Sequence, residues 1–273
     1  MKLANYIFAE KIGQGAFGTV YKGHNAKTGE SVVIKTENLD VAFSSIKHES
    51  NILNILYSKH CRNIPPTYWY GVNSALNQRA LVMPFYEESL ENITPPSRQI
   101  ASKIIQSAIS ILSHIHDKYV VHRDIKPANF MIHQNELILI DFGLASFYVD
   151  SDERHIPPSK KQHIIGTPKY ASWNVHRGEE YSRRDDLMSV VYVGLFLLYG
   201  HGESAPSEPS DFDKTSIFHP RNQWLMRQKN IGIIRDKTLD WKELSDFAEM
   251  VYGLSFQERP SYRDYIGKFR REE

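Results

Sequence analysis

The sequence has few of the features that mark secreted or membrane-spanning proteins. Cys61 is the only cysteine among 273 residues, so no intrachain disulfide can form, as is typical of a reducing compartment. The most apolar stretch, 187–199, is too short to span a bilayer and predicts a buried helix. The opening residues contain no apolar core of the kind that a signal peptide needs.

An excess of charge is also missing. The net charge of +1 argues against nonspecific nucleic-acid binding through global charge, though not against local basic patches. We therefore expect an intracellular protein, cytoplasmic, nuclear or both, with no membrane or nucleic-acid partner.

What is present is the composition of an ordinary globular protein, with 41% hydrophobic residues. The patterns predict an α+β fold: a small β-rich part with one main helix, then a larger and mostly helical part. Strands are expected at 6–12, 19–22, 31–35, 68–72 and 79–83, helices at 41–58 and 97–118, and a mobile loop at 149–163. We place the small part at about 1–83, a linker at 84–88 and the larger part at about 89–273, within one domain.

A glycine-rich segment lies between the first two predicted strands. Residues Gly13-Gln14-Gly15-Ala16-Phe17-Gly18-Thr19-Val20 match the pattern G-x-G-x-x-G-x-V. Without side chains, this backbone can close over phosphates and offer N–H donors to them. The dinucleotide-binding version would open a helix, whereas this sequence continues as a strand. Taken alone, the motif is equally compatible with a hairpin that binds nothing.

Lys35 ends the apolar strand at 31–35. A buried ammonium needs a partner, and Glu49 on the following helix can supply one. Such a lysine binds nucleotide phosphates while the glutamate holds it in place. The alternative is a surface lysine on an edge strand.

The segment His122-Arg123-Asp124-Ile125-Lys126-Pro127-Ala128-Asn129 places many polar groups beside apolar strands. Asp124 can accept the proton of a substrate hydroxyl and orient its oxygen for in-line attack. Lys126 can neutralise charge on a transferring phosphoryl group, and Asn129 offers a carbonyl oxygen to Mg²⁺. A polar surface turn does not explain such dense charge, and His122 is expected to pack in the core.

Twelve residues after Asn129, the tripeptide Asp141-Phe142-Gly143 follows another apolar strand. A carboxylate at this place can coordinate the Mg²⁺ that bridges two phosphates. The tripeptide alone is common in turns, but its order and spacing after the preceding motif give it weight. The four parts together predict phosphoryl transfer.

These motifs resemble those of eukaryotic protein kinases and, within them, the casein kinase 1 family. Most kinases carry Ala-Pro-Glu where this chain has Ser172-Trp173-Asn174, and the casein kinase 1 family has Ser-Ile-Asn there. The features shared with that family extend over essentially the whole chain: His155-Ile156-Pro157, Gly166-Thr167-Pro168-Lys169-Tyr170-Ala171, Ser182-Arg183-Arg184-Asp185-Asp186-Leu187, Ser89-Leu90-Glu91 and Leu254-Ser255-Phe256 to Tyr265.

The resemblance implies a bilobal protein-kinase fold, ATP with Mg²⁺, and transfer to Ser or Thr hydroxyls of acidic or already phosphorylated proteins. It implies that Met83 is the gatekeeper, that Pro84–Tyr86 is the adenine hinge, and that Asp186 bonds the catalytic loop. Catalytic roles fall to Asp124, Lys126, Lys35 and Glu49, and metal binding to Asn129 and Asp141. ATP contacts are expected from Ile12, Gly13, Gly15, Gly18, Val20, Val33, Lys35, Met83, Tyr86, Met131 and Asp141.

The resemblance also implies a substrate anion site. Lys169 and Lys229 occupy places where the family has basic residues that bind a phosphate or sulfate, and Arg123 is expected to join them. The alternative is that these cations are merely solvated surface charges.

Other functions stay open from the sequence. One is a pseudokinase that binds phosphopeptides as a scaffold, although a scaffold needs none of Lys35, Asp124 and Asp141. Another is a small-molecule phosphotransferase, although the long segment 141–174 better suits a protein substrate. Since the regulatory tails of several family members have no counterpart, we expect a constitutively active enzyme. We also expect a monomer.

Overall fold

The structure is a computed structural model that describes residues 2–15, 18–73, 77–200, 215–238 and 240–270. Two residues of the predicted glycine loop, Ala16 and Phe17, lie outside the described residues. The chain divides into two compact units. The first contains Met1–Glu88 and Met131–Leu144, and the second contains Ser89–Phe130 and Ala145–Glu273.

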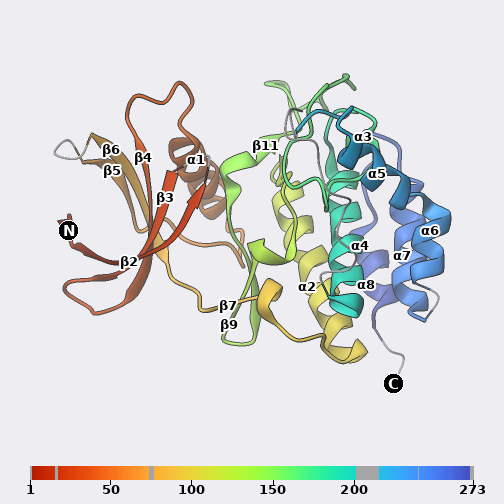
Figure 1. Ribbon diagram of the computed structural model, residues 1–273, viewed down its shortest axis with the longest axis horizontal. Coiled ribbons are helices and arrows are strands. Elements are labelled where there is room, and N and C mark those ends of the chain that lie inside the picture. Colours follow the sequence, from red (N-terminus) through yellow and green to blue (C-terminus); the bar gives the residue numbers. More distant parts are fainter. Residues whose placement is uncertain (1, 16–17, 74–76, 201–214, 239, 271–273) are drawn as a thin grey trace. The chain divides into compact units, whose positions relative to one another are not determined.

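The first unit is built on an antiparallel sheet with the strand order β1-β2-β3-β4-β6-β5 (Figure 1). Its strands are β1 (Lys2–Leu3), β2 (Tyr6–Gly15), β3 (Gly18–Asn25), β4 (Ser31–Asn38), β5 (Trp69–Asn73) and β6 (Gln78–Pro84). All five strands predicted in this region are present, and most extend by a few residues beyond their predicted ends.

Strand β4 shows how the sheet places its polar residues. Val32 and Ile34 are fully buried, whereas Val33 and Lys35 alternate with them and are only partly covered. Because successive side chains in a strand point to opposite faces, Lys35 lies on the face opposite to that core. The core on the buried face consists of Leu3, Tyr6, Val32, Ile34, Ala80 and Val82.

Helix α1 (Ser45–Ser58) begins four residues later than the predicted start at 41. Ser44 caps it, because its hydroxyl accepts a hydrogen bond of 3.1 Å from the backbone N–H of Lys47. The buried face of the helix carries Ile46, Glu49, Ile52, Leu53 and Leu56. Glu49 therefore belongs to the buried stripe although it is charged.

Residues 131–144 group with the first unit, whereas the linear division of the sequence counts them with the second. They contain most of the hairpin of β9 (Phe130–His133) and β10 (Glu136–Leu139), followed by the 3-10 helix η4 (Phe142–Leu144). The two turn residues, Gln134 and Asn135, have φ of 51° and 64°, as in a tight hairpin turn. Asn63 holds this segment: its carbonyl accepts from Leu139 N–H at 2.9 Å, and its Nδ2 donates to the Leu137 carbonyl at 3.1 Å.

The second unit is mostly helical (Figure 1). Its elements are η2 (Leu90–Asn92), α2 (Arg98–His116), β8 (Val120–Val121), η3 (Pro127–Asn129), β11 (Ser146–Phe147), α3 (Trp173–His176), α4 (Arg183–Tyr199), α5 (Pro220–Gln228), α6 (Ile231–Lys237), α7 (Lys242–Tyr252) and α8 (Tyr262–Lys268). The short strand β7 (Glu88–Ser89) spans a boundary between the units. The polar stretch at 149–163 forms turns and isolated bridges.

Helix α4 is the buried helix predicted at 187–199, and it begins earlier, at Arg183. The backbone N–H of Ser182 donates to Asp185 Oδ2 at 2.8 Å, which fixes the first turn. Both α2 and α7 pack against this helix. No helix in the described part of the chain is long and apolar enough to cross a membrane.

An aromatic cluster fills the core where α7, α8 and the residues around them meet. The Phe247 ring lies 5.5 Å from that of Tyr265 and 5.8 Å from that of Phe269, between ring centroids. Trp241 packs edge-on against Phe269 at 6.0 Å. Trp241 and Phe247 are fully buried, so this cluster is part of the core of the second unit.

Replacing Phe247 by alanine should lower the free energy of unfolding by about 3–5 kcal/mol, because the lost ring leaves a cavity in a packed core. Urea unfolding measures the effect. Phe218 is 69% exposed, so Phe218→Ala serves as the control and should change the free energy by less than about 0.5 kcal/mol. Similar values for the two variants would contradict the packing described for the cluster.

Candidate active site

In the first unit, Lys35 lies between two carboxylates. Its Nζ is 2.8 Å from both carboxylate oxygens of Glu49 and 2.8 Å from Asp141 Oδ1. Glu49 comes from the buried face of α1, and Asp141 comes from the end of the segment that Asn63 holds. The structure therefore excludes the alternative in which Lys35 is a solvated surface residue.

Burial shapes the charges in this cluster. Burial alone would lower the pKa of Lys35, but the carboxylates of Glu49 and Asp141 outweigh it and raise the pKa above its usual value. Burial raises the pKa of Glu49, and the Lys35 ammonium opposes that shift. Lys35 is thus held as a cation at neutral pH, which is the state that a phosphate-binding lysine requires.

Asp141 has a left-handed backbone, with φ of 69°, and its side chain is 46% exposed. The N–H of the next residue, Phe142, donates to Glu49 Oε1 at 3.2 Å. This bond ties the Asp-Phe-Gly turn to α1 and fixes the direction of the aspartate. The turn thereby presents a carboxylate while its aromatic residue, Phe142, is fully buried.

A cavity of about 180 Å³ adjoins this cluster within the first unit. Its lining includes Gly18, Val20, Lys35, Glu49 and Asp141. Gly18 has φ of 126°, and a Cβ there would lie 2.0 Å from the Thr36 carbonyl oxygen, so only glycine fits. The cavity thus joins the end of the glycine-rich hairpin to the lysine and the Asp-Phe-Gly carboxylate.

The other residues expected to contact ATP lie elsewhere in the first unit and are not among the described residues that line this cavity. Gly13 pairs with Val20, and Gly15 with Gly18, in the hairpin register. Ile12 is exposed, whereas Met83 is buried in β6. The remaining three, Val33, Tyr86 and Met131, are partly covered.

In the second unit, Asp124 is the centre of a hydrogen-bonded group. Its Oδ2 accepts from Lys126 Nζ at 2.7 Å and from Asn129 Nδ2 at 3.2 Å. Its Oδ1 accepts from the backbone N–H of Thr167 at 2.8 Å and from the Thr167 hydroxyl at 2.7 Å. Four donors therefore hold this carboxylate in one orientation.

Thr167 is a positioning residue that the sequence did not reveal. Besides its two bonds to Asp124, its hydroxyl lies 3.0 Å from Lys126 Nζ. Gly166 makes this approach possible: its φ is 85°, and a Cβ would lie 2.2 Å from the Arg123 carbonyl oxygen. The only earlier signal was the place of Gly166-Thr167 in a segment that resembles the family's activation segment.

Asp186 supports the backbone of the catalytic loop, as the resemblance implied. Its carboxylate is fully buried and accepts from the N–H groups of His122 at 2.8 Å and Arg123 at 3.0 Å. The Tyr181 hydroxyl donates to it at 2.9 Å, and His116 Nε2 lies at 2.9 Å. Burial alone would raise the pKa of Asp186, but its hydrogen bond with His116 and the bonds from the loop hold it below the usual range.

The three cations of the expected anion site are placed in different ways. Lys169 and Lys229 line one pocket of the second unit, and Arg123 is not among its described lining residues. Lys229 is only 4% exposed, and burial lowers its pKa well below the usual value. Its Nζ donates to the carbonyls of Pro168, at 2.9 Å, and Ala171. The structure thus excludes a solvated surface position for Lys229 and shows it holding the backbone at 168–171.

Further anchors of this segment come from helices. The Ser189 hydroxyl donates to the Tyr170 carbonyl at 2.8 Å, and Ser172 bonds the buried carboxylate of Asp185. Burial raises the pKa of Asp185 to about 6. Sequence reasoning missed the Ser189 anchor, because a serine inside an apolar helix carries no motif. Ser172 lies in a segment that carries the family resemblance, but its bond to Asp185 was not predicted.

Two predicted metal ligands offer oxygen atoms of the kind that Mg²⁺ prefers. Asp141 offers a carboxylate oxygen, and Asn129 offers an amide oxygen. Among the described residues, no cluster of three or more His, Cys, Asp or Glu side chains can hold a metal ion by itself. A Mg²⁺ ion bound by either side chain would therefore need water and phosphate oxygens as further ligands.

Replacing Asp186 by asparagine should lower the free energy of unfolding by about 3 kcal/mol at neutral pH, because the donors around it lose a buried charged acceptor. The folded pKa of Asp186 is depressed, so its contribution to stability is present above the unfolded pKa of about 3.9 and is lost as the pH falls through the folded value. Urea unfolding at several pH values should show the difference between wild type and variant narrowing in acid. Asp236→Asn, at an exposed position, is the control, and a difference independent of pH would contradict this role.

The geometry can be set beside known protein families. A family model described as the protein kinase domain matches residues 6–267. The match covers both the Lys35 cluster and the Asp124 group. The α+β architecture, with a β-rich first unit and a helical second unit, is the one that this family implies. The chain belongs to the protein kinase family.

Proposed function

We propose that the protein is a serine/threonine protein kinase similar to the casein kinase 1 family, which transfers the γ-phosphate of ATP to acidic or already phosphorylated protein substrates. The observation that carries the proposal is the Asp124 group, in which Lys126, Asn129 and Thr167 hold one carboxylate. Protein kinases use ATP, typically with Mg²⁺, and the preference for Ser or Thr follows from the resemblance.

In the proposed reaction, the Asp124 carboxylate orients the substrate hydroxyl and takes its proton. The hydroxyl oxygen then bonds to the γ-phosphorus as the bond to the β,γ-bridging oxygen breaks, and ADP leaves. Lys126, 2.7 Å from Asp124 Oδ2, neutralises charge on the transferring group. Bound Mg²⁺ would supply further neutralisation of the phosphates.

Lys35 has the complementary role at the nucleotide. Glu49 holds its ammonium in place, and in the proposed complex Lys35 exchanges its contact with Asp141 for phosphate oxygens. The Lys35–Glu49 pair and the Asp124–Thr167 bonds are both formed in the unmodified chain. They support the proposal that the kinase is active without phosphorylation of its activation segment.

The proposal extends to partners and location. Lys169 is the expected contact for an acidic or phosphorylated residue of the substrate, because its ammonium lies in the segment that follows Thr167. We place the protein in the cytoplasm, the nucleus or both, as a monomer without membrane partners, and the single cysteine is typical of such a reducing compartment. The net charge of +1 agrees with the absence of a nucleic-acid partner. The proposed substrates are therefore proteins with acidic segments.

Transfer of radiolabelled phosphate from ATP to casein tests the activity. Asp124→Asn should reduce the rate by about 10²–10⁴-fold, because the base that orients the hydroxyl is lost. Nucleotide affinity, measured by calorimetry, should stay unchanged in the variant. No transfer by the wild type, with binding of ATP and Mg²⁺ intact, would reject the proposal in favour of a pseudokinase scaffold.

Two lysine variants test the substrate site. Lys169→Ala should raise KM for peptides with a phosphoserine or acidic residues before the target by about tenfold, while neutral peptides are little affected. Lys229→Met removes the donors to the carbonyls of Pro168 and Ala171, so it should lower kcat/KM for every peptide. Steady-state kinetics on matched peptides gives both values. A loss confined to acidic peptides in Lys229→Met would show that Lys229 binds substrate, and equal use of acidic and basic peptides by the wild type would reject the acidic preference.

A further inference from the structure

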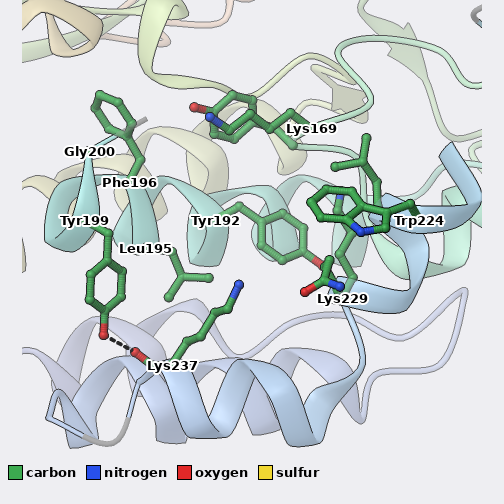
Figure 2. Close-up of a pocket in the computed structure, with 12 residues that line it drawn as sticks. Lys169, Tyr192, Leu195, Phe196, Tyr199, Gly200, Trp224, Lys229 and Lys237 are labelled. Carbon is green, nitrogen blue, oxygen red and sulfur yellow. Dashed lines mark hydrogen bonds between the residues drawn. The ribbon is translucent and has the colours of Figure 1, made fainter. Parts of the chain in front are cut away.

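A cavity of about 390 Å³ lies in the second unit (Figure 2). Asp124 and its hydrogen-bond partners are not among the described residues that line it. Residues of α4, α5 and α6 line it, together with Lys169 and Tyr170. Its volume is within the range of pockets that bind small organic molecules, about 300–1,000 Å³. The catalytic roles described above do not use this cavity.

The walls of the pocket are mainly apolar and aromatic. Tyr192, Leu195, Phe196 and Tyr199 come from α4, and Trp224 and Leu225 come from α5. Figure 2 shows the rings of Tyr192 and Tyr199 on either side of Leu195. Such a surface favours an apolar ligand body, because burying apolar area releases water from both partners.

The basic side chains of the pocket are all lysines. Lys169, Lys229 and Lys237 line it, and none of the described lining residues is acidic. Lys229 already donates to backbone carbonyls. Lys237 is exposed and forms no ion pair with any residue in the described part of the chain, and Figure 2 shows its side chain extending from α6 toward Leu195 and Tyr192. A ligand with a negative group therefore complements the pocket.

A second observation points to a ligand with an acceptor. Tyr192 is 7% exposed, and its buried hydroxyl has no hydrogen-bond partner among the described residues. Buried hydroxyl groups without a partner are uncommon and destabilising. An oxygen atom of a bound ligand would satisfy this donor.

The walls also restrict the kind of ligand. Most of the lining residues lie in helices, whose backbone groups are bonded within each helix, so these walls offer no strand edge to an extended peptide. A peptide backbone in this apolar pocket would lose its hydrogen bonds to water without replacement. A small molecule with one acidic group does not have that cost.

We propose that this pocket binds a small amphipathic carboxylic acid. Its apolar body packs against the aromatic walls formed by α4 and α5, and its carboxylate pairs with the Lys237 ammonium. The Tyr192 hydroxyl donates a further hydrogen bond to the ligand. The pocket is separate from the cavity beside Lys35, and it shares Lys169 with the proposed contact for the protein substrate.

Isothermal titration calorimetry of the whole chain tests the proposal with three probes of equal length: octanoate, 1-octanol and octylammonium. Octanoate should bind with one-to-one stoichiometry, 1-octanol at least about tenfold more weakly because it has no charge, and octylammonium not at all. Absence of octanoate binding, or equal binding of octanoate and 1-octanol, would overturn the proposal.

Variants locate the binding site. Lys237→Gln should weaken octanoate binding by about tenfold, and Leu195→Phe should abolish it by filling the cavity. Lys103→Gln, an exposed lysine on α2, is the matched control and should bind like the wild type. Unchanged binding in Lys237→Gln would overturn the proposal even if Leu195→Phe failed to fold. The measurement needs neither ATP nor a protein substrate, so its failure is distinguishable from failure of the proposed kinase activity.

Discussion

The buried carboxylate of Asp186 joins parts of the second unit that are as much as 70 residues apart in the sequence. A carboxylate without water is stable only when donors surround it, and here the donors are two backbone N–H groups of the catalytic loop, Tyr181 and His116. The Asp186 carboxylate is stable in the core because the loop N–H groups donate to it. The same hydrogen bonds fix the conformation of the loop backbone. The orientation of Asp124, two residues after His122, depends on these hydrogen bonds between Asp186 and the loop.

A second buried side chain, Lys229, also binds backbone groups. Its Nζ donates to the carbonyls of Pro168 and Ala171, and these bonds fix the segment that follows Thr167. Thr167 in turn bonds Asp124. The catalytic loop and the activation segment are therefore both held by buried ionisable side chains that bind backbone groups. In the first unit, by contrast, the Lys35 charge is balanced by the carboxylates of Glu49 and Asp141, as suits a group that must change partners.

The parts of this architecture that the sequence predicted are those that local patterns determine. The apolar run at 32–34 predicted β4, and the 3.6-residue period predicted α2. Motif spacing predicted the partners Lys35 and Glu49. The sequence could not show that Lys229 is buried, because a lysine in a polar helix end has the same local pattern whether it meets solvent or a carbonyl. It also did not show that 131–144 joins the first unit, since that depends on the distant Asn63.

The hydrogen bond between His116 and Tyr262 has a consequence for the extent of the functional domain. His116 Nδ1 lies 2.6 Å from the Tyr262 hydroxyl, while its Nε2 faces Asp186. Tyr262 is the first residue of α8, the last helix among the described residues. A fragment that ended before this helix would keep every catalytic side chain yet lose the group that sets the orientation of the His116 ring. The minimal catalytic unit therefore has to include Tyr262, because Tyr262 orients the His116 ring that bonds Asp186.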